Sequence, residues 1–63
     1  MNRIREFRVQ AGLTELQLAR KINKSVASVS LYESGDRMPP IPVAKAIGKA
    51  LGCEWGKLFE EDG

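Results

Sequence analysis

The side chains of this sequence that could bind a ligand are mainly those of lysine and arginine. Several of them lie in or next to one segment, from Gly12 to Gly35. The positive charges in and beside this segment are those of Arg20, Lys21 and Lys24 near its middle and of Arg37 just after its end. Exposed lysine and arginine side chains can hold phosphate groups, which gives a binding affinity that falls as salt is added. The backbone N–H of Gly35 is a further candidate donor, because N–H groups in turns can point outward toward an anion. The simpler interpretation, a solvated surface, fits Lys45, Lys49 and Lys57, which lie away from the segment.

No group of residues in the sequence has the pattern of a catalytic or metal site. The sequence contains no histidine, which removes the commonest general base and the commonest metal ligand. Serine, lysine and acidic residues occur, but no nucleophile is grouped with a base, no glycines cluster to cradle a phosphate, and no metal-ligand spacing is present. We therefore expect a protein that is not an enzyme and that uses no metal, cofactor or small-molecule substrate.

The composition indicates one small domain spanning residues 1–63. A hydrophobic content of 43% is ordinary for a globular protein, and the net charge of +2 favours an anionic partner only weakly. The single cysteine, Cys53, cannot form an internal disulfide, so an intracellular setting is expected. No apolar run approaches the roughly 20 residues of a membrane span, and the first residues lack the apolar centre of a signal peptide. We therefore expect a soluble, cytoplasmic protein without contact to a membrane.

The segment from Gly12 to Gly35 has the pattern of two short helices that pack across a tight turn. The residues spaced to share one buried side are Leu18, Ala19, Ile22, Val29 and Tyr32. Ala19 is small where the two helices would approach most closely, and Asn23 falls where the turn needs a positive φ, which asparagine tolerates. The pattern predicts a helix-turn-helix, a motif that usually holds DNA.

The whole sequence predicts five helices and no strand, and therefore an all-α fold. The expected helices cover residues 2–11, 14–22, 25–33 and 41–51, followed by a short one that carries Trp55, Leu58 and Phe59. Thr14 and Gln17 have the spacing of a capping box at the start of the second helix, and Ser25 is a suitable N-cap for the third. Asn2 is expected to cap the first helix, and Gly12 to end it.

A set of residues spread over most of the chain matches the signature of a known family. These residues are Arg8, Gly12, Leu13, Thr14, Leu18, Ala19, Ser25, Val29, Ser30, Glu33, Ser34, Gly35, Pro39, Ala50, Leu51 and Gly52. In this order and at these spacings, the sequence resembles the lambda-repressor/Cro type of helix-turn-helix domain, also called the XRE family, from about Ile4 to Phe59. The resemblance implies a five-helix fold whose third helix lies in the major groove, in a regulator that binds a palindromic operator as a homodimer. The two half-sites would lie about 34 Å apart, one turn of the double helix.

The resemblance also implies roles for individual residues. The base-facing positions would be Ser25, Val26, Ala27, Ser28, Ser30 and Leu31, and the phosphate-binding positions would be Thr14, Lys24, Gly35 and Arg37. Arg8 and Glu33 are implied to form a structural ion pair between the first helix and the end of the third. Trp55, Leu58 and Phe59 are expected either to close the core or to take part in a dimer contact.

The sequence departs from the family pattern at several positions near the expected DNA side. Glu15 replaces the glutamine that usually touches the DNA backbone, and its carboxylate would repel phosphate. Asn23 replaces the usual turn glycine, Lys24 an apolar residue, and Pro40 a serine. The outward side of the motif, with Glu15 in the second helix and Val26, Ala27 and Leu31 in the third, therefore departs from the family pattern.

Three interpretations of the outward side of the third helix stay open, because Val26, Ala27 and Leu31 are apolar where long polar side chains usually contact bases. The first is contact with thymine methyl groups, with further specificity from phosphate contacts and DNA shape. The second is a protein-interaction module, antirepressor or antitoxin-like, whose apolar patch binds a protein partner. The third is a small error of register that leaves part of this side buried. The leading hypothesis is a sequence-specific transcriptional regulator that binds double-stranded DNA.

Overall fold

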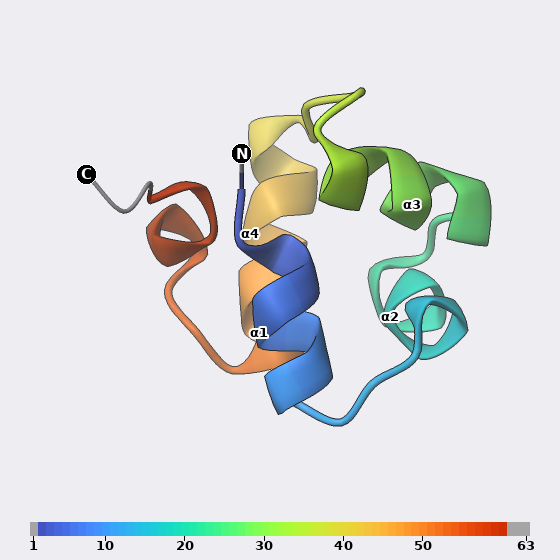
Figure 1. The fold of residues 1–63 in the computed structure, drawn as a ribbon, viewed down its shortest axis with the longest axis horizontal. Helices are drawn as coiled ribbons and strands as arrows, with labels where there is room; N and C mark the ends of the chain where they lie inside the picture. Colours follow the sequence, from blue (N-terminus) through green and yellow to red (C-terminus); the bar gives the residue numbers. More distant parts are fainter. Residues whose placement is uncertain (1, 61–63) are drawn as a thin grey trace.

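The computed structural model describes residues 2–60, which fold into four α-helices and a final 3₁₀ helix (Figure 1). The elements are α1 (Ile4–Gln10), α2 (Glu15–Ile22), α3 (Val26–Ser34), α4 (Ile41–Leu51) and the 3₁₀ helix η1 (Trp55–Phe59). These residues contain no strand, which confirms the all-α prediction. In Figure 1, α1 and α4 form the middle of the domain, η1 lies at the left, and α2 and α3 lie at the right. None of these helices is long and apolar enough to cross a membrane.

The predicted fifth helix is present only as the five-residue 3₁₀ helix η1. Glu54 precedes it, and its side chain caps none of the N–H groups of η1. Five residues leave room for little more than one turn, and short pieces of this kind commonly adopt 3₁₀ geometry. The expectation of five helices is therefore corrected to four α-helices and one 3₁₀ helix within residues 2–60.

The starts of α2 and α3 are fixed by the side chains that the sequence indicated. Thr14 Oγ1 accepts from the Gln17 N–H at 3.1 Å, and Gln17 Oε1 accepts from the Thr14 N–H at 2.8 Å, which completes the capping box. Ser25 Oγ accepts from the Ser28 N–H at 3.1 Å and caps α3. Between the two helices, Asn23 has the predicted positive φ, at 59°. Local hydrogen bonds thus set where each motif helix begins.

Asn2 joins the start of α1 to the end of α3. The N-cap of α1 is Arg3, one residue later than predicted, and the Arg3 side chain accepts no capping hydrogen bond. Asn2 supplies the acceptor instead, because its Oδ1 accepts from the Ile4 N–H at 3.0 Å. Asn2 Nδ2 donates to the carbonyl oxygen of Tyr32 at 2.7 Å. One side chain therefore serves the ends of two helices that are distant in the sequence.

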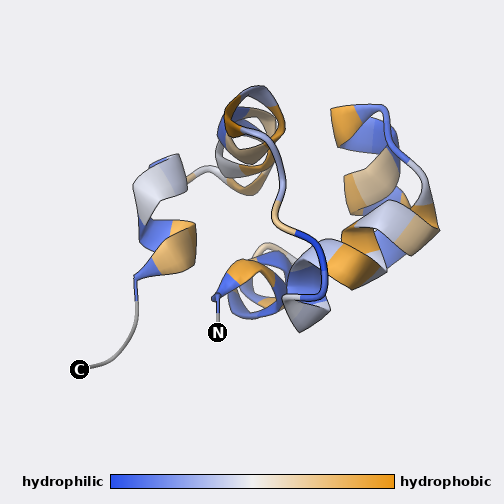
Figure 2. Cartoon of the chain, turned by 90° about the horizontal axis from the view of Figure 1, so that it is seen from above, coloured by the Kyte–Doolittle hydropathy of each residue, from blue (hydrophilic) through white to orange (hydrophobic). Residues whose placement is uncertain are grey.

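The hydrophobic core lies between α2 and α3 and extends to the other helices. Its buried side chains are Ile4, Leu18, Ala19, Ile22, Val29, Tyr32, Ala44, Ile47 and Leu58. This set includes every residue predicted for the inward side of the helix-turn-helix. Figure 2 shows both hydrophobic and hydrophilic residues on the helices, as expected for elements that bury one side only.

Gly48 lets η1 pack directly onto α4. Gly48 is buried, and a Cβ atom at this position would lie 2.8 Å from both Cα and Cβ of Trp55. Alanine normally stabilises a helix relative to glycine by about 0.5–1 kcal/mol. Here its methyl group would instead push the backbone of η1 away from α4. We expect Gly48→Ala to lower the free energy of unfolding by about 1–3 kcal/mol, measured by urea denaturation.

The matched control for this substitution is Gly56→Ala. A Cβ atom at Gly56 would meet no atom within 4 Å. Gly56→Ala should therefore leave the free energy of unfolding unchanged or raise it by up to about 1 kcal/mol. Equal effects of the two substitutions would contradict the close approach at Gly48.

Candidate nucleic-acid interface

Helix α3 presents an uncharged side to solvent. Its inward side is formed by Val29 and Tyr32, which are 1% and 5% exposed. The opposite side, the outer face of α3, consists of Val26, Ala27, Ser30 and Leu31. Val26 keeps 39% of its surface exposed, and Ala27 and Ser30 are also exposed. Apolar and hydroxyl groups, rather than charged ones, therefore form the part of α3 that a ligand would meet.

Two residues expected to face bases are partly covered. Leu31 is half-buried, so the outer face is less open at this end than predicted. Ser28 is also half-buried, because it precedes Val29 at the border of the inward side. The burial of Val29 and Tyr32 shows that the predicted helical register is correct. The third interpretation of the outward side expected partial burial caused by an error of register. Part of this side is indeed covered, but the register is the predicted one.

Most serine hydroxyls near the outer face are engaged within the protein. Ser25 Oγ donates to Ser28 Oγ at 3.1 Å while it caps α3. Ser34 Oγ lies 3.0 Å from the Leu31 carbonyl oxygen and 2.9 Å from a carboxylate oxygen of Asp36, so its hydrogen is shared between two acceptors. Within residues 2–60, the hydroxyl of Ser30 makes no hydrogen bond. Ser30 is therefore the hydroxyl on this side that stays available to a ligand.

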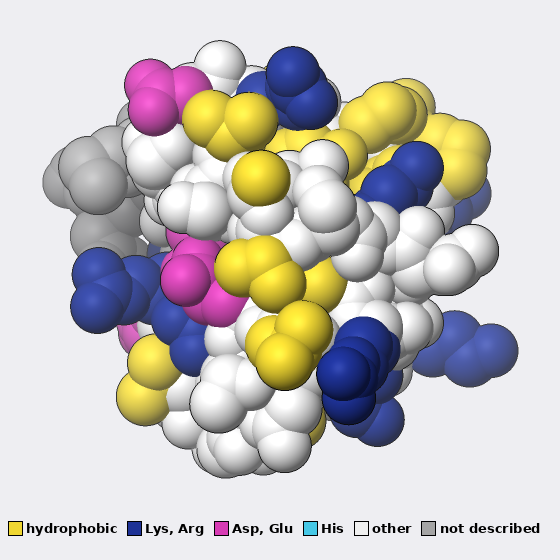
Figure 3. All heavy atoms as spheres, turned by 90° about the vertical axis from the view of Figure 1, so that its right-hand side faces the viewer, with side chains coloured by type: hydrophobic (Ala, Val, Ile, Leu, Met, Phe, Trp, Pro, Cys, Tyr) yellow, Lys and Arg dark blue, Asp and Glu magenta, His cyan; other side chains and the backbone are white. Residues whose placement is uncertain are grey.

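Two exposed cations stand beyond the two ends of α3. Lys24 lies in the turn before the helix, and Arg37 lies in the loop after it. Neither side chain forms an ion pair with another residue in the described part of the chain. Figure 3 shows the side of the domain that carries α2 and the start of α3, with mostly uncharged side chains across its centre, Lys and Arg side chains toward its edges, and Asp or Glu side chains to the left of the centre and at the upper left. This charge distribution suits a ligand with anionic groups on either side of an uncharged centre.

The backbone amides of the turn after α3 are already used. The Gly35 N–H donates to the Tyr32 carbonyl at 3.3 Å, and the Arg37 N–H donates to the Leu31 carbonyl at 3.2 Å. The expectation that the Gly35 N–H is free to bind phosphate is therefore not met, because Gly35 is the C-cap of α3 and its N–H is bonded to the last turn of the helix. The Thr14 N–H is likewise engaged in its capping box. The exposed hydroxyl of Thr14 is the donor of this residue that remains available to a phosphate.

The orientation of α3 is fixed by a bidentate ion pair with α1. Arg8 Nε and Nη2 donate to the two carboxylate oxygens of Glu33, at 2.6 and 3.2 Å. Arg8 Nη1 donates to the Leu13 carbonyl oxygen at 2.7 Å. The side chains of Arg8 and Glu33 are 11% and 6% exposed. The ion pair that the resemblance implied is therefore present, and its geometry is of the strong, directional kind.

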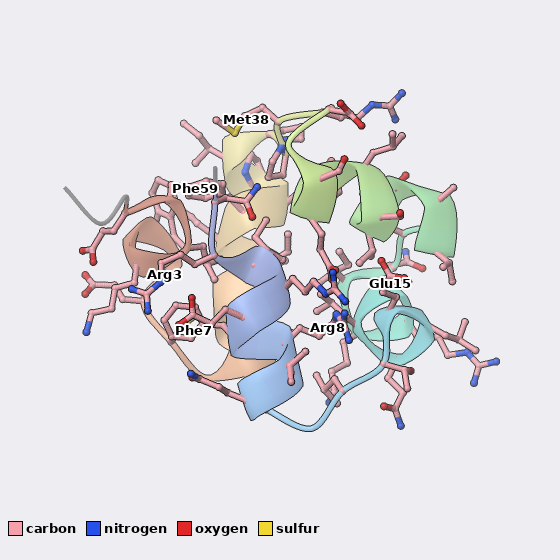
Figure 4. All side chains as sticks on the ribbon, in the orientation of Figure 1. Arg3, Phe7, Arg8, Glu15, Met38 and Phe59 are labelled. Carbon is pink, nitrogen blue, oxygen red and sulfur yellow. The ribbon has the colours of Figure 1, made fainter. Side chains whose placement is uncertain are left out.

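Glu15 lies near this ion pair at the start of α2. The hydrogen bond to Glu33 raises the pKa of Arg8, and the charge of Glu15 adds to this effect. In Figure 4, the Arg8 side chain reaches from α1 toward α2, where Glu15 lies. An open hollow of 430 Å³ at this point is lined by Asn2, Arg5, Arg8, Glu15, Ser30, Glu33 and Ser34. Glu15 and the ion pair of Arg8 with Glu33 thus border the same hollow.

Arg5 lines the same hollow as Ser30, and sequence reasoning did not single it out. Arg5 is exposed on α1, and Ser30 belongs to α3. Only the packing of α1 against α3 brings these residues to one place. No motif or helical spacing in the sequence could have joined them.

A family model for helix-turn-helix domains matches residues 4–58. The chain belongs to this helix-turn-helix family. It is 31% identical over 58 residues to the uncharacterized HTH-type transcriptional regulator YqaF of Bacillus subtilis, a match that covers 92% of this chain and 76% of the relative. An uncharacterized HTH-type transcriptional regulator of Methanothermobacter thermautotrophicus is 33% identical over 63 residues, covering 95% and 91% of the two chains. Another, from Archaeoglobus fulgidus, is 32% identical over 57 residues, covering 90% and 81%.

This helix-turn-helix protein exposes only part of the residues expected at a dimer contact. Leu58 is 0% exposed, so it closes the core and offers no surface to a second copy. Trp55 and Phe59 are half-buried. Lys45 Nζ lies 6.0 Å from the centre of the Trp55 ring. A dimer contact in this region would therefore involve the exposed edges of Trp55 and Phe59, without Leu58.

The cysteine of this helix-turn-helix protein is a free, half-buried thiol. Burial raises the pKa of Cys53, and the nearby charge of Lys57 opposes this effect. The Cys53 thiol therefore stays protonated at neutral pH and is a weak nucleophile. Among residues 2–60, no three His, Cys, Asp or Glu side chains gather in a way that could hold a metal ion.

Proposed function

We propose that this chain is a sequence-specific transcriptional regulator that binds a palindromic operator as a homodimer, with α3 in the major groove of double-stranded DNA. The observation that carries the proposal is the pair of exposed cations, Lys24 and Arg37, at the two ends of an exposed and uncharged helix side. An α-helix with its side chains is about 10–12 Å across, which fits a major groove about 12 Å wide. The names of the three relatives, HTH-type transcriptional regulators, support the same function.

In this proposal the contacts to the DNA backbone come from the two ends of the motif. Lys24, Arg37 and the hydroxyl of Thr14 hold phosphates, and such contacts supply most of the affinity. The ion pair between Arg8 and Glu33 keeps α3 at a fixed angle to the rest of the domain. A second copy doubles the number of contacts, which a domain this small needs for tight binding.

Selection of binding sites from random duplex DNA tests the proposal, followed by a salt titration on the best site. We expect a palindromic consensus with half-sites about 34 Å apart. The logarithm of the binding constant should fall linearly with the logarithm of the salt concentration, by about 0.9 for each phosphate contact. Failure to enrich any sequence, while a protein partner is retained, would overturn the proposal.

Retention of a protein partner without enrichment of any DNA sequence would support the alternative, a protein-interaction module on a helix-turn-helix scaffold. The observation that favours it is the exposure of large apolar side chains near the motif. Val26, Met38 and Ile41 are 39%, 72% and 59% exposed. Exposed apolar patches commonly mark protein contact sites.

The proposal also predicts the effect of removing the charge of Glu15. We expect Glu15→Gln to tighten DNA binding by about threefold for each half-site, because two like charges a few ångströms apart in water repel by about 1 kcal/mol or less. The measurement is fluorescence anisotropy on the selected operator at one salt concentration. Glu54→Gln, at an exposed position before η1, is the matched control and should leave the affinity unchanged. A Glu15→Gln variant that binds no more tightly would show that α2 does not approach phosphate.

A further inference from the structure

The outer face of α3 lacks every side chain that forms paired hydrogen bonds with a base. Discrimination by such bonds uses arginine or lysine on guanine, asparagine or glutamine on adenine, and acidic side chains on cytosine. The outer face consists of Val26, Ala27, Ser30 and Leu31, and none of these side chains carries an amide, a guanidinium or a carboxylate. The outer face of α3 therefore cannot distinguish the bases by paired hydrogen bonds.

The hydroxyl groups do not make up for this lack. Ser25, Ser28 and Ser34 are already bonded within the protein, where they cap α3 and shape the turn that follows it. Ser30 retains one hydroxyl, and a single hydroxyl can pair with almost any base edge. What remains specific on this side is the apolar surface of Val26 and Ala27.

One apolar group is found on the major-groove edge of unmodified bases, the C5-methyl of thymine. We infer that α3 recognises the C5-methyl group of pyrimidines, in thymine and equally in 5-methylcytosine, through Val26 and Ala27. The inference rests on the proposed DNA-binding function and names the feature of the operator that this function would detect. Because 5-methylcytosine carries the same methyl at the same ring position, it raises the affinity relative to cytosine when it stands at the contacted position.

The position of these side chains is suited to such a contact. Val26 and Ala27 lie in the first turn of α3, the end of a recognition helix that meets the base edges. Val26 and Ser30 are four residues apart and therefore share one line along the helix, about 6 Å of rise. A methyl group that packs against Val26 would cover part of the 39% of its surface that is exposed. Burial of one methyl-sized group corresponds to about a fourfold change in affinity.

The experiment uses the whole chain and the operator obtained by selection. Each thymine of the half-site is replaced in turn by uracil, which removes the methyl group and keeps both base-pairing and groove hydrogen bonds. We expect at least one position where uracil weakens binding by about fourfold at constant salt. At that position, a C·G pair also lacks the methyl group. Methylating this cytosine at C5 should then raise the affinity, relative to the unmethylated C·G pair, by a similar factor. Uracil in the flanking sequence is the control and should have no effect.

Two variants separate methyl recognition from general binding. Val26→Ala should bring the thymine-to-uracil ratio toward one, whereas Arg37→Gln should weaken binding to both operators and leave the ratio unchanged. Circular dichroism checks that the Val26→Ala variant is folded. If the variant is unfolded, the comparison of thymine with uracil on the unaltered chain still tests the inference. An operator that contains no thymine in its half-sites, or equal affinity for thymine and uracil at every position, would overturn the inference while leaving the proposed function intact. If no DNA is selected at all, the proposed function itself fails.

Discussion

Replacing Glu33 with alanine is expected to lower the free energy of unfolding by about 3 kcal/mol, because it leaves the guanidinium of Arg8 largely buried without its counter-ion. The substitution also removes two hydrogen bonds, at 2.6 and 3.2 Å. For a domain of this size, about 3 kcal/mol corresponds to a fall in melting temperature of about 12–24 °C. Thermal unfolding followed by circular dichroism measures the effect directly.

The chain offers a matched control in the exposed ion pair between Arg3 and Glu6. Arg3 Nη2 lies 2.8 Å from a carboxylate oxygen of Glu6, but the two side chains are 30% and 48% exposed. Exposed pairs of this kind contribute little to stability because solvent screens them. Glu6→Ala should therefore leave the melting temperature almost unchanged. Similar losses in Glu6→Ala and Glu33→Ala would argue against a special role for the buried pair.

A double-mutant cycle isolates the interaction of Arg8 with Glu33. The double variant Arg8→Ala with Glu33→Ala should be less destabilised than the sum of the single variants, because it leaves no unpaired charge. Additive effects would indicate that the two side chains act independently. The same variants should bind DNA less well in proportion to their loss of folded protein.

Removal of the two cations that flank α3 is expected to weaken DNA binding by about a hundredfold at low salt, since the double variant Lys24→Gln with Arg37→Gln gives up four phosphate interactions per homodimer. The slope of the salt dependence should become shallower by about 0.9 for each phosphate that is no longer neutralised. Both side chains are exposed and form no ion pair among residues 2–60, so the fold should be unaffected. Anisotropy titrations at several salt concentrations provide both quantities.

Lys49→Gln is the control for a general effect of charge. Lys49 is exposed on α4, away from α3 in the sequence. Its substitution removes one positive charge and should change the affinity by less than about twofold, because distant charges are screened. If Lys49→Gln weakened binding as much as Lys24→Gln, the cations would act through net charge alone and the assignment of Lys24 to phosphate would be wrong.

The helix-turn-helix itself follows from local features of the sequence. Thr14 pairs with Gln17, and Ser25 caps α3, each through hydrogen bonds that span three residues. Asn23 adopts its positive φ at the turn because its own backbone preference permits it. Features of this kind can be predicted because their physical cause lies within one helical turn. The ion pair between Arg8 and Glu33 spans 25 residues, and it was expected only from the resemblance to a family.

The packing of the elements settled several features that the sequence left open. The close approach at Gly48, the complete burial of Leu58, and the proximity of Glu15 to Arg8 depend on helices that meet only in the folded chain. A sequence reports periodicity and local hydrogen bonds, but it does not report how near two backbones come or which partner a side chain finds.

The all-α fold, the motif and the inward side of α3 were thus readable from the sequence, because helical periodicity specifies which side is buried. Which groups on the outer side stay available became clear only from the folded arrangement. Packing of the helices half-buries Ser28 and Leu31, and it leaves Val26, Ala27 and Ser30 exposed. How much of a helix its neighbours cover depends on contacts between distant parts of the chain, which helical periodicity does not specify.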